Sequence, residues 1–244
     1  MLQEIIDAIG LVLFPPLARC SLCSAPLLDD LQKEYDDGVC DLCIAQLPWI
    51  KEPFCPRCHL PDVDSVKDCP DCQGLPHGFR LNRSLLRYED SGRELMHLYK
   101  FRNRIHLARF FAAEIAKKII CILPETYDII SYVPMHPQAV RQRGYNQSEI
   151  LAKELSLRCD IPCRELLRKL SISVPSSQLT RDERWLPERG EPYVLHQKAR
   201  EHLSSSPKVI LVDDVLTTGA TAHFCSMLLR EAGAKEIAVL TVAR

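Results

Sequence analysis

The 244-residue sequence has no excess of charge of either sign, because 31 lysines and arginines stand against 32 aspartates and glutamates. Any site for nucleic acid or an anionic membrane must therefore be a local patch. No apolar run approaches the ~20 residues that span a bilayer. Residues 1–14 lack the basic start and cleavage site of a signal peptide, and their apolar side chains recur at helical spacing. We expect a soluble, cytoplasmic protein with a short amphipathic helix at this end.

Two common nucleotide-binding patterns are also missing. The sequence contains neither a Walker lysine in a glycine-rich loop nor a G-x-G-x-x-G run. Both patterns supply the backbone cradle that nucleoside triphosphates and dinucleotides require in the large families that use them. Those two ligand classes are therefore disfavoured.

Cysteine, by contrast, is abundant and clustered. Eight of the twelve cysteines form four C-x-x-C pairs within the first 72 residues. One such turn presents two thiolates to one ion, and two turns complete a tetrahedral zinc site, so two structural Zn²⁺ sites are predicted. Sequential pairing is the simplest arrangement, and an interleaved one stays open. The predicted ligands are Cys20, Cys23, Cys40, Cys43, Cys55, Cys58, Cys69 and Cys72.

The composition changes near residue 76, which predicts a zinc-binding domain at 1–76 and a second domain at 77–244. Apolar periodicity in the second domain predicts alternating helices and strands. This alternation is typical of a doubly wound, mostly parallel α/β sheet, whose ligands bind at the carboxyl ends of the strands. Helices are expected at 91–100, 104–121, 145–158 and 221–232, strands at 128–133, 208–212 and 236–243, and a loop followed by short strands at 171–197.

Residues 209–221 carry the most specific pattern. An apolar strand ends in Asp213 and Asp214 and continues through a Thr/Gly turn into a helix. Backbone N–H groups at a helix N-terminus bind phosphate, and adjacent carboxylates accept hydrogen bonds from ribose hydroxyls. The run resembles the 5-phosphoribosyl-1-pyrophosphate (PRPP) motif of type I phosphoribosyltransferases over all thirteen positions. The predicted PRPP-binding residues here are Asp213, Asp214, Thr217, Thr218, Gly219, Ala220 and Thr221.

A second constellation follows the predicted strand at 128–133. The turn Pro134, Met135 and His136, followed by Arg141 and Arg143, could grip pyrophosphate, because guanidinium groups offer fixed donors to phosphate oxygens. Solvated surface arginines are the alternative interpretation of this pair.

Taken in order, the zinc pairs, R-x-R-G-Y-N-Q at 141–147 and V-D-D-V-L-T-T-G-A-T at 212–221 resemble the competence protein F (ComF) family. The resemblance implies a double zinc ribbon, a type I phosphoribosyltransferase fold and a cytosolic role in the uptake of single-stranded transforming DNA. It also implies that Asp213 and Asp214 hold ribose, that 217–221 hold the 5-phosphate and that 134–136 form the pyrophosphate loop. Ser176 and Pro187 depart from the glutamine and asparagine usual in the family.

Three functions remain open from the sequence. The preferred one is Mg²⁺-dependent phosphoribosyl transfer to an unknown acceptor, with Asp213, Asp214 and Arg143 as catalytic residues. The second is a non-catalytic module for single-stranded DNA, and the third is a platform for a partner such as a competence helicase or recombination mediator. The DNA module would use a basic patch made of Lys100, Arg102, Arg104 and Arg109, with Tyr99 and Phe101 as stacking surfaces. Aromatic side chains on a helix more often belong to the core, which is the alternative interpretation of these two residues.

Overall fold

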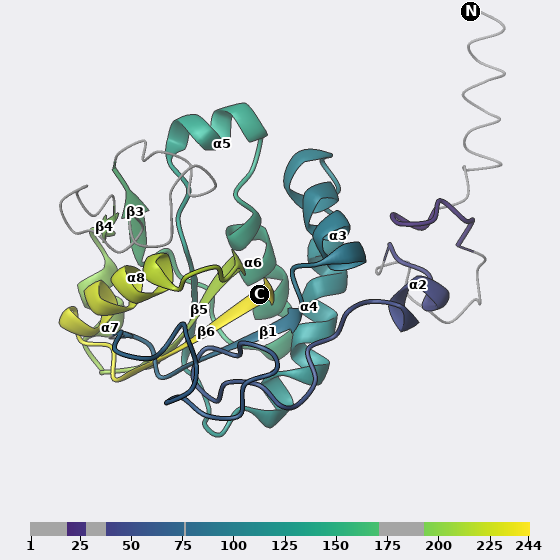
Figure 1. The fold of residues 1–244 in the computed structure, drawn as a ribbon. Helices are drawn as coiled ribbons and strands as arrows, with labels where there is room; N and C mark the ends of the chain where they lie inside the picture. The colour runs from purple at the N-terminus through teal and green to yellow at the C-terminus, as the bar shows by residue number, and fades with distance from the viewer. Residues whose placement is uncertain (1–18, 28–37, 76, 171–192) are drawn as a thin grey trace, which may run out of the picture.

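A computed structural model describes residues 19–27, 38–75, 77–170 and 193–244 (Figure 1). The amphipathic helix expected at 1–14 and residues 171–192 of the expected loop lie outside this description. In the described part of the chain, no helix has the length and apolar character that crossing a membrane requires.

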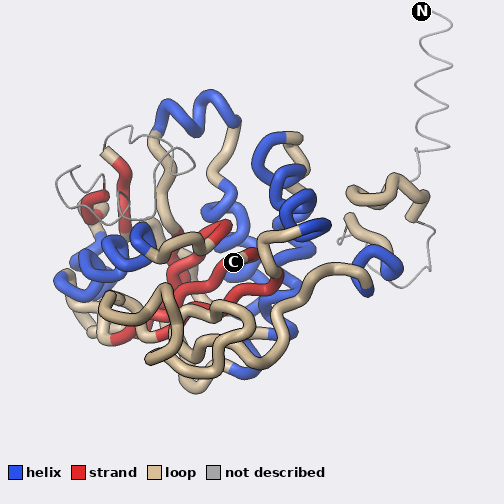
Figure 2. The backbone as a smooth tube through the Cα atoms, viewed as in Figure 1, coloured by secondary structure: helices blue, strands red, loops and turns tan. Residues whose placement is uncertain are grey.

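A four-stranded parallel sheet forms the centre of the molecule (Figure 2), with strand order β1-β6-β5-β2. Its strands are β1 (Leu81–Leu86), β2 (Ile129–Tyr132), β5 (Lys208–Val215) and β6 (Glu236–Ala243). Residues 209–212 of β5 and 237–243 of β6 are buried on both faces and mostly apolar, as parallel strands covered by helices are. The predicted α/β fold class is confirmed, and so are the three predicted strands.

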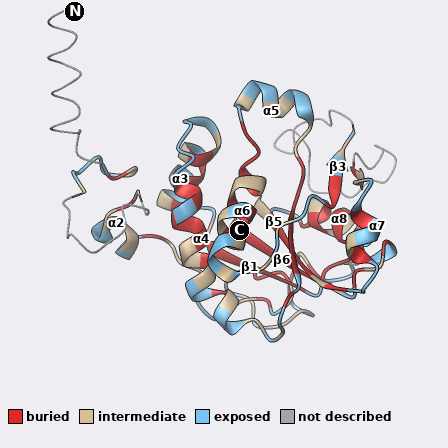
Figure 3. Ribbon diagram, turned by 180° about the vertical axis from the view of Figure 1, so that it is seen from behind, coloured by how far each residue is buried: buried red, intermediate tan, exposed pale blue. Residues whose placement is uncertain are grey.

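Helices cover both faces of the sheet, and alternate strand residues enter two separate apolar cores. On one face Ile210 and Leu240 pack with α3 (Asp90–Phe101), α4 (Leu107–Lys118) and α6 (Gln147–Cys159). On the other face Leu211 and Val239 pack with α7 (Ala199–Leu203) and α8 (Ala220–Glu231). Figure 3 shows the buried residues concentrated in the sheet and on the helix sides that face it. The four predicted helices are therefore present, with small shifts at their ends.

Shorter elements complete the described chain. The helix α5 (Pro137–Arg143) follows β2, and the 3-10 turn η1 (Ile120–Ile122) follows α4. An antiparallel pair, β3 (Leu167–Lys169) and β4 (Tyr193–Leu195), lies beside α8. The strand β4 agrees with the short strands expected at the end of 171–197.

The cysteine-rich segments pack on the two faces of the sheet separately. The first cysteine segment holds the first two C-x-x-C pairs and α2 (Asp41–Ala45), and it contributes Cys20 and Leu47 to the core that contains α4. The second cysteine segment holds the pairs at 55–58 and 69–72, and it contributes all four of its cysteines to the core that contains α8. Because this second segment shares a core with the sheet, the division into domains at residue 76 stays a prediction.

Candidate functional site

The β5–α8 connection places two carboxylates and a helix N-terminus side by side. Asp213 and Asp214 belong to the carboxyl end of β5, and α8 begins at Ala220, four residues beyond Leu216. Gly219 is the N-cap residue, and the N–H of Ala220 donates to Oγ1 of Thr218 over 3.4 Å. The first N–H groups of a helix have no intrahelical acceptor and carry the positive end of the helix dipole. The geometry therefore suits an anion at the turn and hydroxyl donors at the strand end.

Gly219 has a conformational reason to be glycine. Its φ is +84°, in the left-handed region, and a Cβ built there would lie 3.6 Å from the ring of His77. The space would admit a methyl group, but an L-residue in this region costs about 1–2 kcal/mol. The turn therefore depends on glycine for its backbone conformation.

The two carboxylates contact different helices. Oδ1 of Asp213 accepts hydrogen bonds from Oγ of Ser148 (3.0 Å) and from the N–H of Asp214 (2.8 Å). Burial, and then the charge of Asp214, raise the pKa of Asp213 to about 7. Oδ2 of Asp214 forms an ion pair with Nζ of Lys100 at 3.0 Å. Neither Ser148 nor the Lys100 ion pair was predicted, because their elements lie far from the 209–221 motif in sequence.

The loop predicted to bind pyrophosphate lies at the neighbouring strand end. Since β2 pairs with β5 through Tyr132 and Val212, residues 133–136 emerge beside Asp213. His136 caps α5 by accepting a hydrogen bond from the N–H of Gln138 (3.2 Å). The pairing of β2 with β5 thus places Pro134, Met135 and His136 at the same edge of the sheet as the carboxylates. Their contact with pyrophosphate stays a prediction.

The two arginines after this loop differ in their surroundings. Arg141 is exposed on α5. Arg143 donates to Oε1 of Gln147 over 2.8 Å, and its guanidinium lies 5.1 Å from the ring centroid of Phe101. Arg143 is therefore held against the start of α6 and the end of α3, and a role with pyrophosphate would require it to leave or share these contacts.

The remaining residues of the R-x-R-G-Y-N-Q motif connect the site to its scaffold. Asn146 caps α6, accepts from the N–H of Ser148 (3.1 Å) and donates to the carbonyl of Val133 (3.2 Å). Tyr145 donates to the carbonyl of Tyr99, and Gln147 is buried. The motif thus fixes the 133–136 loop relative to α6, which also carries Ser148.

The eight predicted zinc ligands form two compact sets. The Sγ atoms of Cys20, Cys23, Cys40 and Cys43 lie within 4.8 Å of one another, as do those of Cys55, Cys58, Cys69 and Cys72. Four thiols at this spacing suit a tetrahedral Zn²⁺. The sequential arrangement is therefore the one in the structure. All four thiols of the second set are buried, whereas Cys23 of the first is exposed.

Arg244 connects the second cysteine set to the turn between β5 and α8. Nη2 donates to Sγ of Cys58 (3.2 Å) and to Oδ2 of Asp71 (2.5 Å), and Nη1 donates to the carbonyl of Thr217 (3.2 Å). The side chain is 2% exposed. A hydrogen bond from Cys72 and the charge of Arg244 lower the pKa of Cys58 to about 5, against the effect of burial. No sequence motif marks this arginine.

The basic patch expected between α3 and α4 is corrected by the structure. Tyr99 is fully buried and cannot stack on a base. Lys100 pairs with Asp214, and Arg109 lies 3.7 Å from a carboxylate oxygen of Glu154. Only Phe101, Arg102 and Arg104 remain exposed without a carboxylate partner among the described residues. The departures from the family pattern at residues 176 and 187 lie outside the described part.

Two family models match the chain. The double zinc ribbon domain matches residues 10–73, and the phosphoribosyl transferase domain matches residues 140–244. The first range contains all eight clustered cysteines, and the second contains the turn at 217–219.

Curated relatives match along nearly the full chain. Competence protein ComFC of Bacillus subtilis is 27% identical over 92% of this chain and 94% of its own. Competence protein F of Haemophilus influenzae is 28% identical over 85% of this chain and 91% of its own. DNA utilization protein YhgH of Escherichia coli K12 is 26% identical over 85% of this chain and 90% of its own. With such coverage, the likeness includes both the cysteine-rich part and the sheet.

Proposed function

We propose that this chain, which belongs to the competence protein F (ComF) family, binds PRPP with Mg²⁺ and acts in the uptake of single-stranded transforming DNA. The observation that carries the proposal is the meeting of three features at one sheet edge: the carboxylates of Asp213 and Asp214, the N-terminus of α8 and the loop at 134–136. Each feature suits one part of PRPP.

In the proposed complex, the 5-phosphate lies at the backbone of residues 217–221, where N–H groups and the helix dipole favour an anion. The ribose hydroxyls donate to Asp213 and Asp214, and pyrophosphate lies along 134–136 with Arg141. Mg²⁺ would be held by these carboxylates and by pyrophosphate oxygens, and it would neutralise charge on the leaving group.

The chain's own groups must rearrange modestly to bind ribose. Asp214 already holds Lys100 at 3.0 Å, so the ammonium and a ribose hydroxyl would share the two carboxylate oxygens. Because burial and Asp214 raise the pKa of Asp213 to about 7, near neutral pH this carboxyl exists both with and without its proton. A protonated Asp213 can still accept a hydrogen bond, but it attracts Mg²⁺ less.

The cellular role rests on the relatives named for competence and for DNA utilization. In the preferred form, the chain is a phosphoribosyltransferase in which Asp213, Asp214 and Arg143 act at the reacting sugar. In the alternative, the site only binds PRPP, and the chain serves as a binding module for single-stranded DNA or for a competence helicase or recombination mediator. The ion pair of Asp214 with Lys100 is compatible with both forms, and a measurement of turnover distinguishes them.

Calorimetry with Mg²⁺ and PRPP tests the site. Native zinc-loaded protein should bind, and a paired Asp213→Asn, Asp214→Asn variant should not. A matched control, Asp64→Asn with Asp160→Asn, changes two exposed carboxylates and should bind like the native chain. Absence of binding by the native chain would contradict the proposal. Pyrophosphate release with a panel of nucleobases and oligonucleotides then separates the transferase from the binding module.

A further inference from the structure

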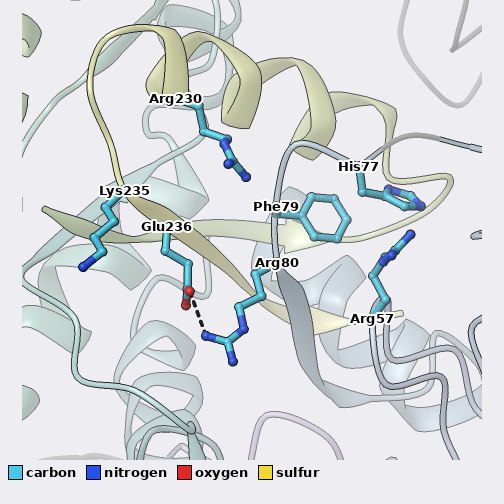
Figure 4. Close-up of a pocket in the computed structure, with 7 residues that line it drawn as sticks. All are labelled: Arg57, His77, Phe79, Arg80, Arg230, Lys235 and Glu236. Carbon is cyan, nitrogen blue, oxygen red and sulfur yellow. Dashed lines mark hydrogen bonds and ion pairs between the residues drawn. The ribbon is translucent and has the colours of Figure 1, made fainter. Parts of the chain in front are cut away.

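A cavity of about 590 Å³ lies between the second cysteine segment, α8 and the amino end of β6 (Figure 4). Gly78 holds the wall of this cavity against α8, since its N–H donates to Nδ1 of His223 over 2.9 Å. The cavity includes the amino end of β6 rather than the carboxyl end of β5, and at its other end His77 and Phe79 lie near Gly219 at the start of α8. It is lined by Arg57, His77, Phe79, Arg80, Arg230, Lys235 and Glu236.

The lining carries an excess of positive charge in a chain whose net charge is -1. Within the described ranges, Arg57, Arg230 and Lys235 have no carboxylate partner, whereas Arg80 pairs with Glu236 at 2.7 Å. Burial lowers the pKa of His77 to about 4, so this ring is neutral at pH 7 and does not add to the charge. Three uncompensated cations therefore face one cavity.

These cations come from different parts of the chain. Arg57 belongs to the second cysteine segment, Arg230 to the last turn of α8, and Lys235 to the turn before β6. In Figure 4, Arg57 and His77 lie at one end and Lys235 at the other. Such a spread suits several phosphates along a strand better than one compact phosphate.

Two further features indicate which part of a nucleic acid the cavity would contact. Arg230 and Lys235 lie at the C-terminal end of α8, where the helix dipole opposes an anion, so side-chain cations must attract the ligand there. Phe79, the one phenyl ring in the lining, is 3% exposed and offers no surface on which a base can stack. Attraction is therefore to the phosphate backbone and not to the bases.

We propose that this cavity is a contact site for the phosphodiester backbone of single-stranded nucleic acid, held by Arg57, Arg230 and Lys235 without base selectivity. The inference rests on the proposed role in DNA uptake, and it replaces the patch at residues 99–109 with a different surface. None of these three cations belongs to the carboxylates or to the turn at 217–221, so the two sites can be tested with separate variants.

Fluorescence anisotropy of a labelled oligothymidylate, measured at several salt concentrations, tests the site. The triple variant Arg57→Ala, Arg230→Ala, Lys235→Ala, called the groove variant below, removes the three cations of the cavity. The control variant, Lys51→Ala, Lys67→Ala, Lys117→Ala, removes three exposed cations outside the cavity. We expect the groove variant to bind at least about tenfold more weakly. Its slope of log affinity against log salt should be smaller by about 2, because each phosphate contact on a single strand contributes about 0.7.

The other outcomes are equally informative. Equal losses in the groove and control variants, or no oligonucleotide binding by the native chain, would overturn the site. Competition by inorganic tripolyphosphate at the same phosphate concentration as the oligonucleotide would also overturn it, in favour of a small-anion site. Oligoadenylate should bind as oligothymidylate does.

Titration of the same proteins with Mg²⁺ and PRPP separates this inference from the proposed function. The groove variant should keep native PRPP affinity and a full zinc content. If the native chain bound oligonucleotide at the groove but no PRPP, the cavity assignment would stand and the PRPP proposal would fail. If the native chain bound PRPP but no oligonucleotide, the PRPP proposal would stand and the cavity assignment would fail.

Discussion

Replacing Arg244 by methionine tests whether the second zinc site stabilises the turn at 217–219. Methionine keeps much of the apolar stem and removes the guanidinium, which donates to Cys58, Asp71 and Thr217 from a side chain only 2% exposed. Removing one member of a buried ion pair costs about 3–5 kcal/mol, because the other charge stays buried. Asp71 is 15% exposed, so we expect the low end, about 3 kcal/mol.

The same substitution should weaken the ligand site by a smaller amount. Thr217 loses one hydrogen bond at its carbonyl, and a typical net hydrogen bond is worth about 1 kcal/mol, or about fivefold in PRPP affinity. Urea unfolding of zinc-loaded protein gives the first quantity and calorimetry with Mg²⁺ and PRPP gives the second. Arg200→Met, on the exposed surface of α7, is the control. Native unfolding free energy together with native PRPP affinity in the Arg244 variant would refute the connection.

Three further predictions concern the zinc sites, Asp213 and the turn. Cys58→Ser should remove one zinc per chain and lower the melting temperature more than Cys40→Ser does, because all four thiols of the second set lie in the core that contains α8. Zinc analysis and calorimetric melting measure the two quantities. Equal losses of melting temperature in the two variants would contradict this prediction. The raised pKa of Asp213, about 7 against 3.8, means that the folded chain binds its proton more tightly, so the free energy of unfolding should fall as pH rises from about 4 to about 7. Urea titrations across that range should show this fall in the native chain but not in Asp213→Asn, and identical profiles would count against it. Gly219→Ala should cost about 1–2 kcal/mol, since its φ is +84°, and it should weaken PRPP binding in calorimetry; unchanged stability would show that the turn tolerates an L-residue.

Much of the fold could be predicted because the central strands are apolar runs. β1 was missed because it contains Asn82 and Ser84, which read as loop residues in the sequence. Both side chains are buried, with Ser84 bonded to Thr241 at 2.6 Å and Asn82 bonded to the carbonyl of Cys58 at 3.0 Å. A strand whose buried polar side chains bond to partners distant in sequence carries little local apolar signal.

The candidate site likewise has one part that the sequence predicts and one part that it does not. Asp213, Asp214 and the turn after them lie within one contiguous motif, so residue types and order were enough to find them. Ser148 and Arg244 reach the site from α6 and from the end of β6, and only the folded sheet brings them there. Single serines and arginines are too common in sequences to indicate such contacts. The pairing of cysteines was predictable as the simplest arrangement, because consecutive C-x-x-C turns close the shorter loops.

Hydrogen exchange of the backbone amides, followed by mass spectrometry with and without Mg²⁺ and PRPP, tests the proposed site most directly. The 5-phosphate should accept hydrogen bonds from N–H groups of residues 217–221, so exchange in this segment should slow when PRPP is present. The paired Asp213→Asn, Asp214→Asn variant should show no such change. Unchanged exchange at 217–221 in native protein that binds PRPP, with protection elsewhere, would contradict the assignment of this edge of the sheet.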